Sequence, residues 1–144
     1  MTKYRFHGRT EQTKAAIKRK ADGKALFAMG KQHYLGAMYL AGYAIECKLK
    51  AAAMLYYNVD TLKDLSEKMK IDEDRLYSHN LEALMGLTPL DKSIRTGEVW
   101  KDFVTQVSRW SPSWRYDSKN PPEEIAAAFL AAVNNVYNWI DANS

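Results

Sequence analysis

Apolar residues recur at every third or fourth position over a stretch from about His33 to Tyr57. This spacing matches one face of an α-helix and predicts a long helix with an apolar seam. Two glycines and several alanines lie in the same stretch. Because glycine inside a helix costs about 1 kcal/mol relative to alanine, they indicate close packing against a neighbouring helix. The seam consists of Leu35, Met38, Gly42, Ile45, Leu49, Ala52 and Tyr56.

Three other long stretches predict helices. Residues 11–29 form one that Gly30 separates from the next helix. A second covers residues 97–110, and a third starts after Asn120, a predicted N-cap, with Pro121 in its first turn. Short helices are expected over 61–70 and 79–85, joined by an acidic turn at 72–74. The predicted inward residues are Ile17, Ala21, Ala25 and Ala28 in the first helix, Trp100, Phe103, Val107 and Trp110 in the second, and Ile125, Phe129, Ala132, Val136 and Ile140 in the third.

These helices predict an all-α fold. No alternating apolar and polar run is long enough to indicate a strand. The chain has 144 residues and lacks an internal repeat or linker, so residues 1–144 are expected to form one domain. The expected architecture is an antiparallel up-and-down four-helix bundle with one or two additional short helices.

Composition excludes several classes of protein. The chain is 47% hydrophobic and 26% charged, which is typical of a folded domain rather than a disordered one. No stretch approaches the roughly 18 uncharged apolar residues of a membrane span. Met1–His7 lacks the apolar core of a secretory signal, and the single cysteine, Cys47, cannot form an internal disulfide. We therefore expect a cytoplasmic protein that does not bind membranes.

Positive charge is concentrated near the start of the chain. Residues 1–31 carry a net charge of +7 and the remainder −3, within a total of +4. Such a segment can attract a phosphate backbone or an acidic partner. Alternatively, its charges are the solvated face of a surface helix. The basic residues are Lys3, Arg5, Arg9, Lys14, Lys18, Arg19, Lys20, Lys24 and Lys31.

Common metal and nucleophile patterns do not occur in the sequence. His7, His33 and His79 have no His or Cys neighbour at ligand spacing, so no metal is expected. There is no glycine-rich phosphate loop and no serine in a nucleophile elbow, and no cofactor is expected. Cys47 lies within an apolar helix, where we expect an unreactive core thiol.

Two groups of polar and aromatic residues are candidates for binding or catalysis. Glu46 and Lys50 share a helix face, either as a surface pair worth about 0.3 kcal/mol or as a carboxylate at the core edge that requires a cationic partner. The stretch Arg109–Asp117 combines two tryptophans, two arginines and a tyrosine, which suits stacking on bases and contacts to phosphates. Alternatively, Trp110 and Trp114 close the end of the bundle while Arg115 pairs with a buried acid such as Glu46.

Three stretches together resemble HEPN domains (higher eukaryotes and prokaryotes nucleotide-binding). Residues 36–51, GAMYLAGYAIECKLKA, resemble the family's Ala-rich second helix, with Glu46 followed by Leu-Lys-Ala. Residues 78–84, SHNLEAL, are similar to its His-x-Leu-x-x-Leu helix start, and Arg115-Tyr116 to its Arg-Tyr before the last helix. The resemblance extends from about Ala25 to Ile140.

The resemblance implies a four-helix bundle, often dimeric. Many members are metal-independent ribonucleases of toxin–antitoxin or defence systems, and others are non-catalytic and encoded beside a small nucleotidyltransferase. Catalytic members carry Arg, four to six residues, then His. Here the corresponding positions after Arg115 hold Asn120, Pro121 and Pro122, and Arg75 is followed by His79 after only three residues. The ribonuclease motif is therefore missing.

The sequence leaves three functions open. The first is a non-catalytic or diverged HEPN-like module that binds nucleotide or RNA, or a nucleotidyltransferase-type partner. This module is expected to be a homodimer. The second is a metal-independent ribonuclease with a rearranged centre of His79 with Arg115 or Arg75. The third is a dimeric scaffold that holds a partner protein through the small-residue face of helix 33–57. The expected binding residues are Arg109, Trp114, Arg115, Tyr116, Lys50 and His79, with Glu46 and Arg115 as a structural ion pair.

Overall fold

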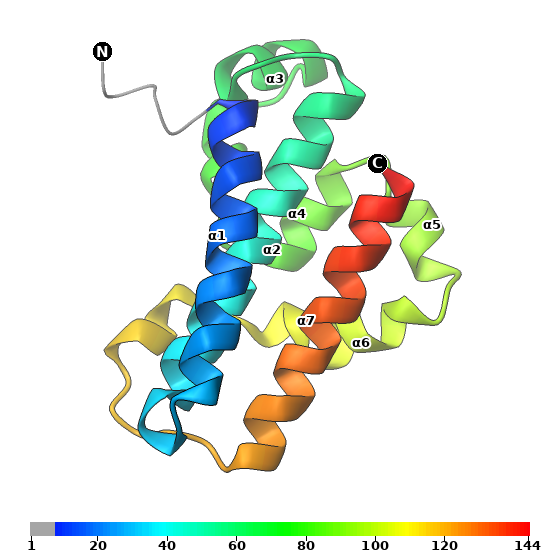
Figure 1. Ribbon diagram of the computed structural model, residues 1–144. Helices are drawn as coiled ribbons and strands as arrows, with labels where there is room; N and C mark the ends of the chain where they lie inside the picture. Colours follow the sequence, from blue (N-terminus) through cyan, green and yellow to red (C-terminus); the bar gives the residue numbers. More distant parts are fainter. Residues whose placement is uncertain (1–7) are drawn as a thin grey trace.

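The computed structural model describes residues 8–144, and every regular element in this range is helical (Figure 1). The all-α prediction is confirmed for these residues. Met1–His7, with Lys3 and Arg5, lie outside them. The long helices are α1 (Arg9–Ala28), α2 (Tyr34–Tyr56) and α7 (Glu123–Asn143), and the shorter ones are α3 (Leu62–Met69), α4 (Leu81–Leu87), α5 (Asp91–Arg95) and α6 (Val99–Thr105). The 3₁₀ turns are η2 (Lys31–His33), η3 (Glu73–Tyr77), η4 (Val107–Arg109) and η5 (Pro112–Tyr116).

Helix α2 is the centre of the fold because α1 and α7 both pack on it (Figure 1). Its buried residues lie on all sides of the helix, as expected for an element surrounded by others. Helix α1 approaches closely at Gly23, where a Cβ would lie 2.9 Å from the carbonyl oxygen of Ala37. The small-residue face of α2 is thus largely covered within the chain. Ala37, Ala41, Gly42 and Ala44 are all buried, so the expected exposed interface on this face is wrong.

The predicted inward face of α1 is also wrong. Ile17 is 59% exposed, and Ala21, Ala25 and Ala28 are exposed as well. The buried residues of α1 are Ala16 and Gly23. The absence of a side chain at Gly23 decides which side of α1 can approach α2, and this outweighs the apolar character of Ile17.

The predicted helix over 97–110 is two shorter elements. Helix α6 ends at Thr105, and Gln106 leaves helical geometry with φ −120° and ψ −66° before η4 begins. Its inward face is nevertheless correct in part, because Phe103, Val107 and Trp110 are buried. The framework of the chain therefore has three long helices and a shorter α6 packed on α7.

Asn120 does not cap α7, which begins at Glu123 after Pro122. The Asn120 Oδ1 instead accepts a hydrogen bond from the backbone N–H of Leu35 at 2.9 Å, at the start of α2. Its Nδ2 donates to the Gln32 carbonyl oxygen at 3.3 Å. Asn120 thus ties the start of α2 to the segment before α7. Most of the predicted α7 seam is buried, and Ile125 is 54% exposed.

The short helices begin near the predicted positions because each has a side-chain cap. The Thr61 hydroxyl accepts from the backbone N–H of Asp64 at 3.0 Å, and Asn80 Oδ1 accepts from that of Ala83 at 3.0 Å. Within residues 8–144, no helix combines the length and apolarity that crossing a bilayer requires.

Candidate functional site

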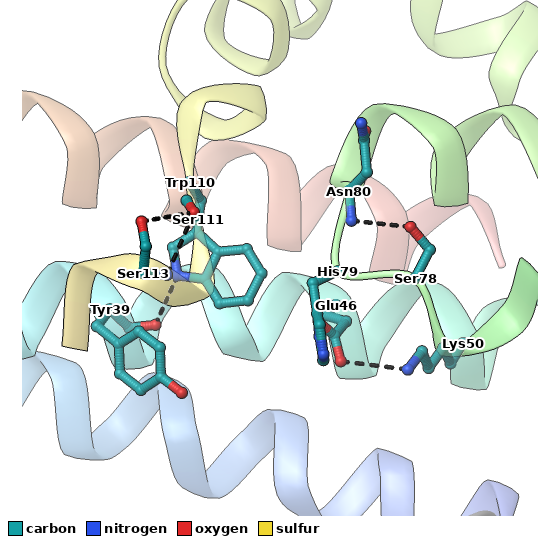
Figure 2. Close-up of polar contacts among 9 residues, drawn as sticks. All are labelled: Tyr39, Glu46, Lys50, Ser78, His79, Asn80, Trp110, Ser111 and Ser113. Atoms are coloured by element: carbon teal, nitrogen blue, oxygen red, sulfur yellow. Dashed lines mark hydrogen bonds and ion pairs between the residues drawn. The ribbon is translucent and has the colours of Figure 1, made fainter. Parts of the chain in front are cut away.

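Four polar residues of α2 lie along one side of the helix. Tyr39, Tyr43, Glu46 and Lys50 follow one another at intervals of four, three and four residues, which is the repeat of a single helix face. Two groups of side chains meet this face, and Figure 2 shows them at separate places along α2. One group surrounds Glu46 and the other surrounds Tyr39.

Glu46 is a buried carboxylate with two partners. Its side chain is 4% exposed, Oε2 accepts from Lys50 Nζ at 3.2 Å, and Oε1 lies 2.7 Å from His79 Nδ1 (Figure 2). Lys50 is itself only 6% exposed, so the surface-pair interpretation is wrong and the core-edge interpretation is confirmed. Burial of a carboxylate is tolerable here because both oxygens have a partner.

The loop before α4 holds His79 against Glu46. Asn80 caps α4, and its backbone N–H donates to Ser78 Oγ at 3.0 Å, which fixes the turn on which His79 lies (Figure 2). The side chain of His79 is 55% exposed. When His79 is neutral, the carboxylate favours the proton on Nδ1, which leaves Nε2 as a proton acceptor. A histidine oriented by a carboxylate in this way is equipped for proton transfer.

The second group is built around Trp110. Its ring covers Gly42, and its Nε1 donates to the Tyr39 carbonyl oxygen at 2.9 Å (Figure 2). Trp114, on η5, packs edge-on against Phe129 of α7 with 5.3 Å between ring centroids. The two tryptophans therefore anchor the segment between α6 and α7 to the core, in agreement with the bundle-closing interpretation.

Arg115 and Tyr116 lie on the solvent side of this anchored segment. The Arg115 guanidinium carbon is 4.9 Å from the centroid of the Tyr116 ring, and Tyr116 is 77% exposed. Hydrogen bonding to Tyr116, followed by the charges of Tyr116 and Tyr39, raises the pKa of Arg115 above its ordinary value. The pair thus presents a permanent cation and an aromatic ring to solvent.

The predicted site residues do not form one site. Glu46, Lys50 and His79 come together, but the predicted Glu46–Arg115 ion pair is wrong, because Lys50 and His79 occupy the carboxylate and Arg115 lies against Tyr116. Lys50 is buried against Glu46 and does not belong to the exposed surface of Arg115 and Tyr116. Two other predicted residues, Arg109 and Arg75, are exposed on η4 and η3.

The sequence interpretation missed two tyrosines. Tyr39 adjoins Arg115 and raises its pKa, and the Tyr77 ring lies 5.9 Å from the Lys50 ammonium. The four-three-four spacing from Tyr39 to Lys50 was a usable signal for the first. The contact of Tyr77 depends on the path of the chain after α3, which no local pattern specifies.

Cys47 lies next to Glu46 but on the apolar side. Burial, with a further contribution from the Glu46 charge, raises the pKa of this thiol to about 12. The thiol stays protonated at neutral pH and is a poor nucleophile or ligand. Within residues 8–144, no group of three or more His, Cys, Asp or Glu side chains is arranged to hold a metal ion.

The geometry defines an all-α fold with a buried Glu46–Lys50 pair that the partly exposed His79 joins, and a separate exposed surface of Arg115 and Tyr116. Comparison of the chain with protein-family models, with curated proteins and with solved structures found no match. The functional assignment therefore depends on this geometry and on the resemblance of the motifs.

Proposed function

We propose that the chain is a diverged HEPN-like helical bundle that binds nucleotide or RNA at the surface of Arg109, Arg115 and Tyr116. The observation that carries this proposal is the exposed Arg115–Tyr116 pair on a segment anchored by Trp114. An exposed aromatic ring offers a stacking surface for a base, and the adjacent guanidinium offers charge-assisted hydrogen bonds to a phosphate. Since both groups are held near each other before binding, less ordering free energy is lost.

The contact between Glu46 and His79 supports the HEPN-like assignment. These residues belong to two of the motif stretches, lie 33 positions apart in the chain, and approach to 2.7 Å. Together with Lys50 they form one polar cluster on α2. The proposal extends to the remaining family traits, namely a cytoplasmic homodimer associated with a nucleotidyltransferase-type partner in a toxin–antitoxin or defence system.

The proposal is tested by measuring the affinity of a fluorescent single-stranded RNA oligomer and of ATP for the wild type and for Tyr116→Ala. Loss of one base stack costs about 1–3 kcal/mol, which corresponds to a roughly 5- to 150-fold weaker Kd. Arg115→Ala should weaken binding and reduce its dependence on salt.

Arg95→Ala is the matched control for Arg115→Ala. Arg95 also lies over an aromatic ring, 4.5 Å from the Trp100 centroid, but its charge is paired with Asp91 at 3.1 Å. The Kd of this variant should equal that of the wild type. An unchanged Kd for Tyr116→Ala and Arg115→Ala, or no binding by the wild type, would refute the proposal.

A second candidate is a metal-independent ribonuclease with His79 as the proton carrier. The specific observation in its favour is the orientation of His79 by Glu46, which leaves Nε2 free to accept a proton from a ribose hydroxyl. Arg75 or Arg115 would stabilise the developing charge on the phosphate. This candidate requires RNA cleavage in the presence of a chelator that His79→Ala abolishes and His33→Ala, at a histidine outside the cluster, leaves intact.

A further inference from the structure

A long groove runs between α1 and α7 on the surface of α2. One part, of about 740 Å³, is lined by residues 17–27 of α1 and 127–137 of α7, with Ala41 of α2 at its base. A second hollow, of about 450 Å³, lies further along the same two helices, at residues 9–14 of α1 and at Asp141 and Ser144 near the end of α7. In Figure 1, α1 and α7 are separate helices, and α2 is visible between them. None of the residues proposed to bind nucleotide or RNA lines this groove.

The groove exists because the two helices meet α2 at different sides. Because Gly23 has no side chain, α1 packs closely on Ala37 and Ala41 of α2. Helix α7 packs on α2 through other residues, which include Phe129 and Val136. Side chains that a fourth long helix would cover are left exposed on α1. The most apolar of them, Ile17, is 59% exposed.

Most of the apolar side chains that line the larger part of the groove are aliphatic, and the rings of Phe27 and Tyr137 lie among them. Ile17 and Ala21 face it from α1, and Leu130 and Ala131 face it from α7. Small and branched aliphatic side chains favour insertion of leucine-sized residues from a helix at successive turns.

The charge of the groove is positive and is carried mainly by α1. Lys14, Lys20 and Lys24 line it, and none of them pairs with a carboxylate among the described residues. Asp141 lies at one end, but its charge is already offset by Lys48 at 2.6 Å. The unpaired ammonium groups thus form a row along one side of an apolar channel.

We infer that this groove binds one acidic amphipathic helix of a partner protein. The partner helix would place its apolar stripe against Ile17, Leu130 and Ala131, and its Glu or Asp residues beside Lys14, Lys20 and Lys24. The α1 wall extends over residues 9–27, so at about 1.5 Å per residue the groove accommodates a helix of about 18 residues.

A second copy of this chain fits the groove less well. Within residues 8–144, the exposed large apolar side chains of α6 and α7 are single residues, Val104 and Ile125, so neither helix offers a row of large apolar side chains for insertion. The segment before residue 8 is basic, with Lys3 and Arg5, and cannot neutralise the lysines.

The test uses two designed helical peptides of about 18 residues, which differ only in Glu or Lys beside the same leucine stripe. The Glu peptide should bind the full chain at least tenfold more tightly than the Lys peptide in fluorescence anisotropy. Lys20→Glu combined with Lys24→Glu should abolish or reverse that preference, whereas Lys101→Glu on α6 should not change it.

Steric block of the groove separates this site from any other surface. Ala131→Trp places a large ring in the groove and should abolish binding of the Glu peptide. Ala128→Trp, at an exposed alanine of the same helix outside the groove, should leave the Kd unchanged. Circular dichroism confirms that both variants are folded.

Four results would overturn the inference. They are failure of the Glu peptide to bind, equal binding of the two peptides, a dimer of the wild type that Ala131→Trp dissociates, and RNA binding that Ala131→Trp abolishes. The third would assign the groove to a second copy and the fourth to nucleic acid. Because Tyr116→Ala does not touch the groove, the proposed nucleotide or RNA function can fail while this inference holds, and the reverse.

Discussion

Replacement of Gly42 by alanine tests the packing that anchors the proposed binding segment. Gly42 is buried in α2 directly under Trp110, and an added Cβ would overlap the Trp110 ring, with Nε1 2.6 Å away. The ring cannot yield easily because it is 4% exposed and its Nε1 donates to the Tyr39 carbonyl oxygen. We expect Gly42→Ala to displace Trp110 and to destabilise the protein.

The magnitude follows from three contributions. Overpacking of a core site costs about 1–3 kcal/mol, and a buried N–H left without its acceptor costs about 1–3 kcal/mol. Alanine gains about 1 kcal/mol over glycine in a helix. The free energy of unfolding of Gly42→Ala should therefore fall by about 3 kcal/mol.

Gly36→Ala is the matched control on the same helix. A Cβ at Gly36 would meet only Leu26 Cδ1 at 3.6 Å, an ordinary van der Waals contact. This variant should be more stable than the wild type by about 0.5–1 kcal/mol. Urea unfolding followed by circular dichroism and tryptophan fluorescence measures both. If Gly42→Ala is as stable as Gly36→Ala, Trp110 does not pack on Gly42 as described.

Three other predictions concern the buried cluster, the cap of α2 and the thiol. Glu46→Gln should lower the free energy of unfolding by about 3–5 kcal/mol because it leaves the Lys50 ammonium buried without a counter-charge; addition of Lys50→Met should recover part of the loss, and no recovery would count against the pair. Asn120→Ala should cost about 1 kcal/mol in thermal unfolding through loss of the α2 cap, with the exposed Ser118→Ala as a neutral control. Because burial raises the pKa of Cys47 to about 12 from an ordinary value of 9.0, the folded state keeps this proton at a pH where the unfolded state loses it. Stability should therefore decrease as pH rises from about 9 towards 12, and Cys47→Ala should flatten the first part of that decrease; an equal slope in both proteins would refute the assignment.

The sequence was most informative where the apolar pattern alone decides structure. The limits of α2 were predicted to within a residue because its seam is uninterrupted from Met38 to Ala52. The prediction of the buried face of α1 is wrong. The apolar pattern places Ile17 on the inward face, but α1 can approach α2 closely only where Gly23 has no side chain. The apolar spacing likewise places Trp110 in a continuous helix. Its contact with Gly42 instead requires the chain to leave helical geometry at Gln106.

The site was predictable only residue by residue. The spacing of Glu46 and Lys50 placed them on one helix face, and the apolar neighbour Ile45 indicated that the carboxylate lies at the core. The partner of that carboxylate is His79, which is 33 residues away and reaches it through a loop. Pairing across such a distance is decided by tertiary packing, which is why the sequence prediction names Arg115 as the partner of Glu46 and misses His79.

The segment around Arg115 and Tyr116 is where we propose that nucleotide or RNA binds. The most direct measurement is a titration of the isotope-labelled chain with a single-stranded RNA oligomer, followed by amide chemical shifts. We expect the largest chemical-shift changes at Arg109 and at residues 114–116, and we expect Tyr116→Ala to remove them. Changes confined to the groove between α1 and α7, or no changes at saturating RNA, would contradict the proposal.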